Sequence, residues 1–285
     1  MNLSPIYRPH DEAAATARLT ALVADGAWAG LDAHRFEVVS RGDFVPGILY
    51  LPCPTTDPAA AAAPGAGAAP LVIVQHGLAG SKHSVYLECA ARWVREGFAV
   101  AAIDLPLHGE RSSPKLSDRL IQGIERIIRD ERLDPDTHAL VDEFARQSTS
   151  DLVRTLDALS ALESIDSERV GYVGFSLGAV VGTYFLATDP RPKVAVLALA
   201  GGRRGPSDLD PAEYVGRGVA RPILVVAAEQ DQRVSAASSR ALFEAARDPK
   251  EFLAATGDHG NLSGPTLGRI QEFLSKGFLS RRAEG

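Results

Sequence analysis

The sequence has few cysteines, no long apolar run and no excess of positive charge. Only Cys53 and Cys89 occur among its 285 residues, too few for a disulfide framework, so we expect both thiols to be reduced and inert. No apolar run reaches the roughly 18 residues that a membrane span requires. The net charge of −6 argues against a nucleic-acid-binding protein, which usually carries a basic patch.

Other classes of protein also lack their signatures here. No Cys/His cluster has the spacing of a zinc site and no Gly-rich loop matches a phosphate-binding loop, so we expect no metal and no cofactor. The stretch Met1–Pro5 lacks a charged region followed by an apolar one, so we expect no secretory signal and a cytoplasmic protein. The length is sufficient for one large α/β domain with a sizeable core.

Short apolar, strand-like runs alternate with helical segments along most of the chain. We expect strands at 35–40, 44–51, 71–75, 98–103, 170–173, 194–199, 223–227 and 252–255. We expect helices at 85–96, 151–162, 179–187, 236–246 and 266–278. This alternation predicts an α/β fold whose central sheet is mainly parallel and covered by helices on both faces.

Three segments lie outside this alternation. Residues 1–34 form an N-terminal extension, in which 11–25 is predicted to be helical. Residues 54–70 are rich in Pro, Ala and Gly and predict a loop within one sheet, so we expect 1–285 to be a single domain. Residues 105–150 predict a helical insertion, because apolar residues recur at helical spacing over 118–132.

The most informative motif is Gly174–Gly178, which reads G-x-S-x-G. The apolar run Val170–Val173 precedes it and the helical segment Ala179–Ala187 follows it. A serine on such a strand-to-helix turn has its hydroxyl exposed above the sheet, and small neighbours leave room for the tight turn. We therefore predict Ser176 as a nucleophile, and the alternative is a serine that only caps the helix.

An acid and a base follow the serine at the ends of later strands. Asp231 comes just after the strand at 223–227 and His259 lies in the last loop. Open α/β sheets place their ligand sites at these strand ends. A serine hydroxyl needs a base, histidine titrates near neutrality, and a carboxylate orients the imidazole. Glu229 is the credible alternative acid.

The remaining acids and histidines fit these roles less well. Asp104 ends a strand but precedes the serine, and Asp258 needs a different backbone course to face the ring of the adjacent histidine. His83 opens a helix near the mouth of the predicted site. The other histidines for which we weighed a role are expected at the surface, namely His10, His34 and His138.

These features together resemble the α/β-hydrolase family, in particular its small serine esterases of the dienelactone-hydrolase-like and acetyl-esterase-like kinds. The resemblance covers about 35–279 and includes the strand-terminal stretch His76–Gly80, the nucleophile turn, and the order Ser176, Asp231, His259. It implies the α/β-hydrolase fold and a Ser–His–Asp triad. The backbone N–H of Leu177 is expected to bind the oxyanion, and the resemblance assigns the second donor to Leu78.

The chain departs from the family pattern in informative ways. Dienelactone hydrolases proper use a cysteine nucleophile, so the serine at 176 does not imply dienelactone chemistry. Leu78 stands where many lipases have a third glycine, which points away from the hormone-sensitive-lipase type. Ala228 stands where relatives often have a glycine before the acid, which loosens the assignment of Asp231.

The stretch Asp104–Arg111 resembles an Asp-x-Pro-x-His-Gly-x-Arg stretch of some small bacterial esterases. It is either a structural turn, with Glu110 and Arg111 paired nearby, or a part of the substrate pocket to which His108 or Arg111 contributes. The insertion that follows has two interpretations as well. It either packs on the core or forms a homodimer contact, or it walls the pocket as a small lid.

The function predicted from sequence is that of a serine carboxylesterase, which hydrolyses a small or medium ester through an acyl-enzyme. Thioesterase or amidase/peptidase-like hydrolysis is the enzymatic alternative, and a non-catalytic ligand-binding protein is the alternative from another class. These classes differ in geometry, because catalysis requires the hydroxyl of Ser176 to lie within hydrogen-bond reach of the imidazole of His259.

Overall fold

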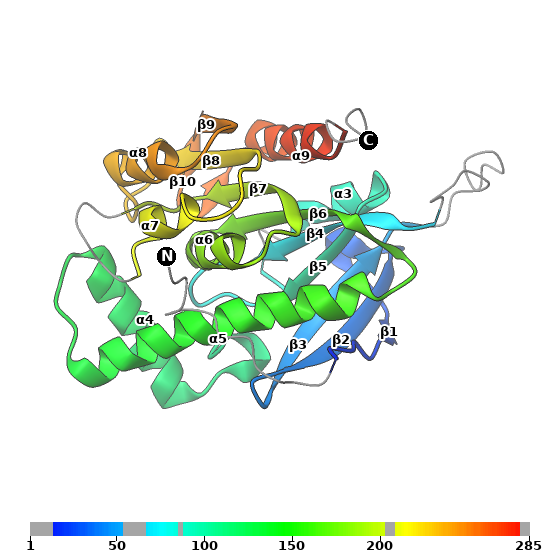
Figure 1. Cartoon of the computed structure of the whole chain (residues 1–285), viewed down its shortest axis with the longest axis horizontal. Helices are drawn as coiled ribbons and strands as arrows, with labels where there is room; N and C mark the ends of the chain where they lie inside the picture. The colour runs from blue at the N-terminus through cyan, green and yellow to red at the C-terminus, as the bar shows by residue number, and fades with distance from the viewer. Residues whose placement is uncertain (1–13, 54–66, 85–87, 203–208, 280–285) are drawn as a thin grey trace.

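The computed structural model describes residues 14–53, 67–84, 88–202 and 209–279. Its main sheet has nine strands in the order β1-β2-β3-β5-β4-β6-β7-β8-β9 (Figure 1). The antiparallel part contains β1 Thr20–Leu22, β2 Asp32–Ser40 and β3 Asp43–Leu51. The parallel part contains β4 Ala69–Gln75, β5 Ala99–Ile103, β6 Ile165–Phe175, β7 Pro192–Ala198, β8 Ile223–Ala228 and β9 Lys250–Ala255. The predicted α/β-hydrolase fold with a mainly parallel sheet is confirmed.

Helices cover both faces of this sheet. Helices α3 Ala90–Arg95 and α9 Gly264–Leu279 pack on one face (Figure 1). The other face carries α5 Pro135–Ser160, α6 Leu177–Thr188, α7 Pro211–Val215 and α8 Ala236–Ala245. Side chains of a strand point alternately to the two faces, so Leu71 and Ile73 join one apolar cluster while Val72 and Val74 join the other. All four are fully buried, as a doubly covered sheet requires.

The N-terminal prediction is wrong where the structure describes it. Residues 14–19 have no regular structure, and 20–22 form strand β1 instead of the predicted helix over 11–25. Strand β1 pairs antiparallel with the edge of β2, and this pairing outweighs the helical preference of an alanine-rich segment. The short 3-10 helix Gly26–Trp28 follows it. Residues before 14, and the 54–66 part of the predicted loop, lie outside the described residues.

The helical insertion contains α4 Pro114–Ile128 and the first half of a longer helix, α5. Helix α4 follows the 3-10 turn Gly109–Arg111 and precedes α5. The helix predicted at 151–162 belongs to the 26-residue helix α5, which begins earlier, at Pro135, and appears as the long green helix in Figure 1. The side chain of Asp134 caps its N-terminus by accepting the backbone N–H of Thr137. The first half of α5 belongs to the insertion and the second half packs on the sheet.

Candidate active site

The nucleophile turn forces its serine into an unusual backbone conformation. Ser176 lies between β6 and α6 with φ 53° and ψ −115°, a region that non-glycine residues rarely adopt. Its N–H donates to the carbonyl of Ala198 over 2.8 Å, which ties the turn to strand β7. A Cβ on Gly174 would lie 2.4 Å from the carbonyl oxygen of Gly178, and one on Gly178 would lie 2.5 Å from that of Gln75. Both flanking glycines are therefore required by close backbone approaches.

A chain of hydrogen bonds joins the three residues predicted as a triad. The Oγ of Ser176 lies 2.8 Å from Nε2 of His259, and Nδ1 of His259 lies 2.8 Å from Oδ2 of Asp231. Asp231 is an acceptor at Oδ2, so Nδ1 carries a proton and Nε2 is placed to accept the hydroxyl proton of the serine. Within this series of hydrogen bonds the acid is more deeply buried than the base: the side chain of Asp231 is 3% exposed and that of His259 is 18% exposed.

Local backbone structure fixes the acid and the base. The second carboxylate oxygen of Asp231 accepts the N–H groups of Arg233 and Val234 over 2.8 and 2.9 Å, so only Oδ2 is directed at the ring. His259 lies at the tip of a small hairpin made by β10 Gly257–Asp258 and β11 Asn261–Leu262. This hairpin presents the imidazole toward the end of β6, where Ser176 stands.

The alternative acids lie elsewhere. Glu229 is exposed, and its backbone N–H bonds to the carbonyl of Ala255. Asp258 is used locally, since its Oδ1 accepts the N–H of Gly260 over 2.8 Å. Asp104 forms a buried ion pair with Lys82. Of the carboxylates weighed from the sequence, Asp231 is the one that the structure brings to the ring.

A cavity of about 990 Å³ opens over the serine and the imidazole. Leu78 and Leu177, the predicted oxyanion donors, both line it beside Ser176. Leu177 is the first residue of α6, whose N–H has no partner within the helix. The apolar walls of the cavity come from α4, α5, α6, the chain before α7 and the first residue of α7, through Ile124, Ile127, Val141, Phe144, Val180, Tyr184, Leu209 and Pro211. The insertion therefore supplies part of the wall of the cavity.

The sequence model of the dienelactone hydrolase family matches residues 58–253. The chain belongs to the dienelactone hydrolase family. It is accordingly a hydrolase, and the matched segment includes Ser176 and Asp231 but ends before His259. No curated protein matches the sequence.

Solved structures of esterases share the fold of this family member. The acetyl xylan esterase from Paenibacillus sp. R4 superposes with a TM-score of 0.68 at 19% identity, covering 92% of this chain and 89% of that chain. A cold-adapted esterase from an Arctic intertidal metagenomic library has a TM-score of 0.63 at 22% identity, with coverages of 86% and 98%. Acetyl xylan esterase 1 from Thermoanaerobacterium sp. JW/SL YS485 has a TM-score of 0.66 at 14% identity, with coverages of 93% and 88%.

His108 and Arg111 lie behind the site of this hydrolase rather than in its cavity. His108 is 2% exposed, and its Nδ1 lies 2.8 Å from the carbonyl oxygen of Pro106. Arg111 bonds to the carboxylates of Asp151 and Asp43 over 2.6 and 2.7 Å. Neither residue is among those that line the cavity in the described part of the chain. The structure thus gives Asp104–Arg111 the arrangement of the structural turn.

Of the histidines expected at the surface or near the mouth of the site, the structure describes His34, His83 and His138. His138 is exposed, as expected, although it reaches the rim of the cavity. His83 is exposed and His34 is half-buried, while His10 lies outside the described residues. No helix within 14–53, 67–84, 88–202 and 209–279 has the length and apolarity that crossing a bilayer requires.

Sequence reasoning missed a buried cluster around Lys82 and the cavity wall supplied by Tyr184 and Leu209. Lys82 is only 4% exposed, although a lysine in a loop ordinarily predicts a solvated side chain. Tyr184 is placed by a bond from its hydroxyl to the carbonyl of Leu209 over 2.6 Å. An aromatic residue in a helix predicts core packing, and nothing local indicates that one edge borders a cavity.

Gly178→Ala is expected to destabilise this hydrolase. The new methyl group would overlap the carbonyl of Gln75, so α6 must move away from β4, at a cost of about 1–3 kcal/mol in the free energy of unfolding. Gly268→Ala in α9 is the matched control, because nothing lies within 4 Å of its added Cβ. There the change should raise the free energy of unfolding by about 0.5–1 kcal/mol. Urea denaturation measures the free energy of unfolding of both variants. Equal changes in the two would contradict the close approach of Gly178 to the carbonyl of Gln75.

Proposed function

We propose that this hydrolase is a serine carboxylesterase that acts through an acyl-enzyme. The observation that carries the proposal is the continuous chain from Oδ2 of Asp231 through both ring nitrogens of His259 to Oγ of Ser176, with 2.8 Å at each step. Such a chain activates a hydroxyl that is otherwise a weak nucleophile at neutral pH. Its exposed end opens into the cavity, where an ester can reach it.

The acylation step follows from these contacts. Oγ of Ser176 attacks the ester carbonyl carbon while its proton passes to Nε2 of His259, and Asp231 stabilises the imidazolium that forms. The carbonyl oxygen becomes an oxyanion that accepts the N–H groups of Leu78 and Leu177. The tetrahedral intermediate then collapses, the bond to the alcohol oxygen breaks, and the proton on Nε2 leaves with the alcohol.

Deacylation repeats the same steps with water in place of the serine. His259 takes a proton from the water as its oxygen attacks the acyl carbon, and the oxyanion again forms beside the two N–H groups. Collapse of this second intermediate releases the carboxylic acid and returns the proton to Oγ of Ser176. The cycle needs no group beyond these residues and water.

The cavity supports an ester with an apolar part of small to medium size. Ile, Leu, Val and Phe are the largest group of its lining side chains and favour hydrocarbon, while charged residues such as Asp130, Arg132 and Arg233 line another part. We assign these walls to the acyl or alcohol portion of the substrate.

Turnover of p-nitrophenyl acetate, butyrate and octanoate tests the proposal, together with labelling by a fluorophosphonate and peptide mapping. We expect turnover of the esters and a covalent adduct on Ser176. Turnover of a thioester and of an amide with the same acyl group tests the alternative thioesterase and amidase activities. Absence of ester turnover, or an adduct at another residue, would refute the esterase assignment.

Ile127→Trp is expected to change chain-length selectivity. Ile127 lines the cavity from α4, so a larger side chain should fill space that a long acyl group needs. We expect kcat/KM for the octanoate to fall about 10-fold, a loss of about 1.4 kcal/mol, while that for the acetate changes less than about twofold. Leu116→Trp is the matched control, because Leu116 lies on the same helix but is 46% exposed and absent from the cavity wall. Equal losses for both esters would contradict a role of α4 in selecting the chain length of the substrate.

A further inference from the structure

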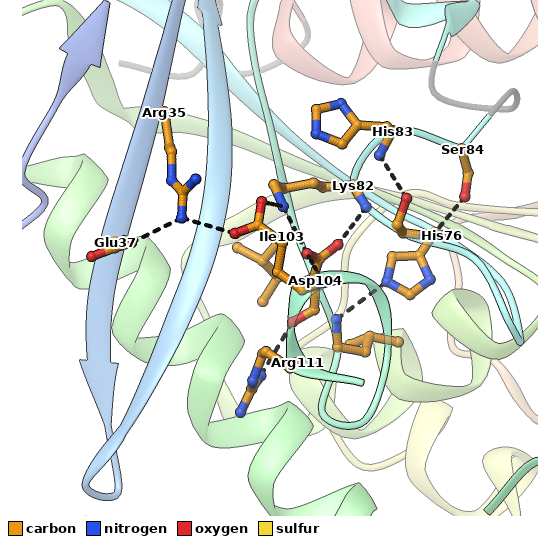
Figure 2. A network of polar contacts seen from close by, with 12 residues as sticks. Arg35, Glu37, His76, Lys82, His83, Ser84, Ile103, Asp104 and Arg111 are labelled. Carbon is orange, nitrogen blue, oxygen red and sulfur yellow. Dashed lines mark hydrogen bonds and ion pairs between the residues drawn. The ribbon is translucent and has the colours of Figure 1, made fainter. Parts of the chain in front are cut away.

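The loop after β4 carries the N–H of Leu78 and is fastened at both ends to the chain after β5. At its start, Nε2 of His76 accepts the N–H of Leu105 over 3.2 Å. At its end, the N–H of Lys82 donates to Oδ1 of Asp104 over 2.7 Å (Figure 2). Between these points the loop lies against the nucleophile, since a Cβ on Gly77 would be 3.2 Å from Cβ of Ser176.

His76 fixes the direction of the peptide that precedes the Leu78 nitrogen. Because its Nε2 accepts a bond, its proton is on Nδ1, which donates to the carbonyl of Gly77 over 2.8 Å. The N–H of Gly80 donates to the same carbonyl over 3.1 Å. In a trans peptide the C=O and N–H point in opposite directions, so holding the Gly77 oxygen also orients the N–H of Leu78.

The ring of His76 is suited to this role because it stays neutral. Burial lowers its pKa to about 4, against the opposing effect of its bond to the Gly77 carbonyl. The ring therefore stays uncharged near neutral pH, and its two hydrogen bonds fix which nitrogen carries the proton. His76 does not itself line the cavity.

Lys82 fastens the far end of the loop through a buried ion pair. Its Nζ lies 2.7 Å from Oδ2 of Asp104 and 2.6 Å from Oε1 of Glu110, and the side chains of Lys82 and Asp104 are 3% and 0% exposed. Burial alone would raise the pKa of Asp104, but the hydrogen bonds from Lys82 and from the N–H of Glu110 hold it below its ordinary value. The carboxylate of Asp104 therefore stays ionised beside Lys82.

The carboxylate of Asp104 also accounts for the backbone course of the stretch Asp104–Arg111. Oδ2 of Asp104 also accepts the N–H of Glu110 over 3.0 Å. The side chain of Arg111 donates to the backbone carbonyl of Asp104 over 3.1 Å (Figure 2). Gly109 has φ 53°, and a Cβ there would lie 2.3 Å from Cγ of Asp104. The turn is thus wrapped around the carboxylate that holds Lys82. The cost of removing both charges from water offsets most of the attraction in a buried ion pair, so the pair adds little net stability. Its directional hydrogen bonds still fix the position of the loop.

We propose that His76 and Lys82 are positioning residues for the oxyanion donor: together, anchored on the segment Asp104–Leu105, they hold the N–H of Leu78 beside Ser176. This inference rests on the esterase function proposed above. The inference also gives a role to the turn Asp104–Arg111, whose His108 and Arg111 do not line the cavity. The donor acts only when the oxyanion forms, so loosening it should lower kcat and leave KM almost unchanged.

The test compares His76→Leu and Lys82→Met with wild type on p-nitrophenyl butyrate, with rates expressed per site titrated by a fluorophosphonate. We expect kcat to fall about 10- to 100-fold, somewhat less than for outright loss of a donor. KM should change less than about threefold. The inhibition constant of an alkyl trifluoromethyl ketone, whose adduct with Ser176 carries an oxyanion, should rise in parallel with the loss of kcat/KM. The pH profile should keep its shape, because Asp231 and His259 are untouched.

Two further variants separate positioning from general stability. His76→Asn keeps a side-chain N–H near the Gly77 carbonyl and should recover most of kcat. Arg221→Met removes another buried cation, which donates to the carbonyls of Leu186 and Asp189 over 3.1 and 3.2 Å on a different part of the fold. It should lower the melting temperature and leave kcat per titrated site unchanged.

The outcomes are distinguishable. Unchanged kcat and unchanged ketone inhibition per titrated site in His76→Leu and Lys82→Met would overturn the positioning role. Should Lys82→Met not fold, Asp104→Asn replaces it, because the amide oxygen still accepts the N–H of Lys82 while the charge is lost; it should show the same loss of kcat. Absence of ester turnover by wild type would instead refute the esterase function.

Discussion

Replacing Ser176 by alanine is expected to lower kcat on p-nitrophenyl butyrate by about 10⁵- to 10⁶-fold, the loss typical when a triad nucleophile is removed. The variant has no atom to form the acyl-enzyme, and the 2.8 Å contact with Nε2 of His259 is lost. The N–H groups of Leu78 and Leu177 remain and should leave a small residual rate above that of water. Steady-state kinetics with highly purified protein measure the effect, and KM should change little because the cavity is unaltered.

The fold should survive this change. Ser176 adopts φ 53° because its turn is fixed by close backbone approaches, and alanine at the same position adds no atom to them. Ser167→Ala, at an exposed position of β6, is the control for removing a serine hydroxyl outside the site. A loss of less than about 100-fold in folded Ser176→Ala would be incompatible with an obligatory serine nucleophile.

Much of the sheet could be predicted because its signals are local. Runs such as 71–75 and 223–227 are apolar throughout, which is what a strand covered on both faces requires, and β4 and β8 lie there. The strand-to-helix turn at Ser176 was also predictable from its glycines, which the structure shows to be needed for contacts at 2.4 and 2.5 Å.

The contacts that sequence could not predict depend on distant residues. Strand β1 exists because β2 offers an edge, and an alanine-rich segment carries no sign of that partner. The hairpin that presents His259 has strands of two residues each, too short for any periodic pattern. The partners of Lys82 lie 22 and 28 residues along the chain, so its burial becomes visible only in the fold.

Asp231→Asn is expected to lower kcat by about 10⁴-fold while leaving the fold intact. An amide oxygen at Oδ1 can still accept the N–H groups of Arg233 and Val234, so the turn should persist. The amide nitrogen then faces Nδ1 of His259 and donates to it, which moves the ring proton to Nε2. A protonated Nε2 cannot take the proton of Ser176, so the attack loses its base. Kinetics with the butyrate ester and a melting curve measure the two properties separately.

Glu229→Gln is the matched control, because this acid lies two residues earlier on the same loop and was the alternative from sequence. Its side chain is exposed, and its backbone N–H is engaged with the carbonyl of Ala255, so the change should alter kcat less than about twofold. The contrast depends on a single physical difference: Asp231 holds a ring nitrogen at 2.8 Å with a side chain 3% exposed, where its charge is poorly screened by water. A larger loss in Glu229→Gln than in Asp231→Asn would transfer the role of the acid to Glu229.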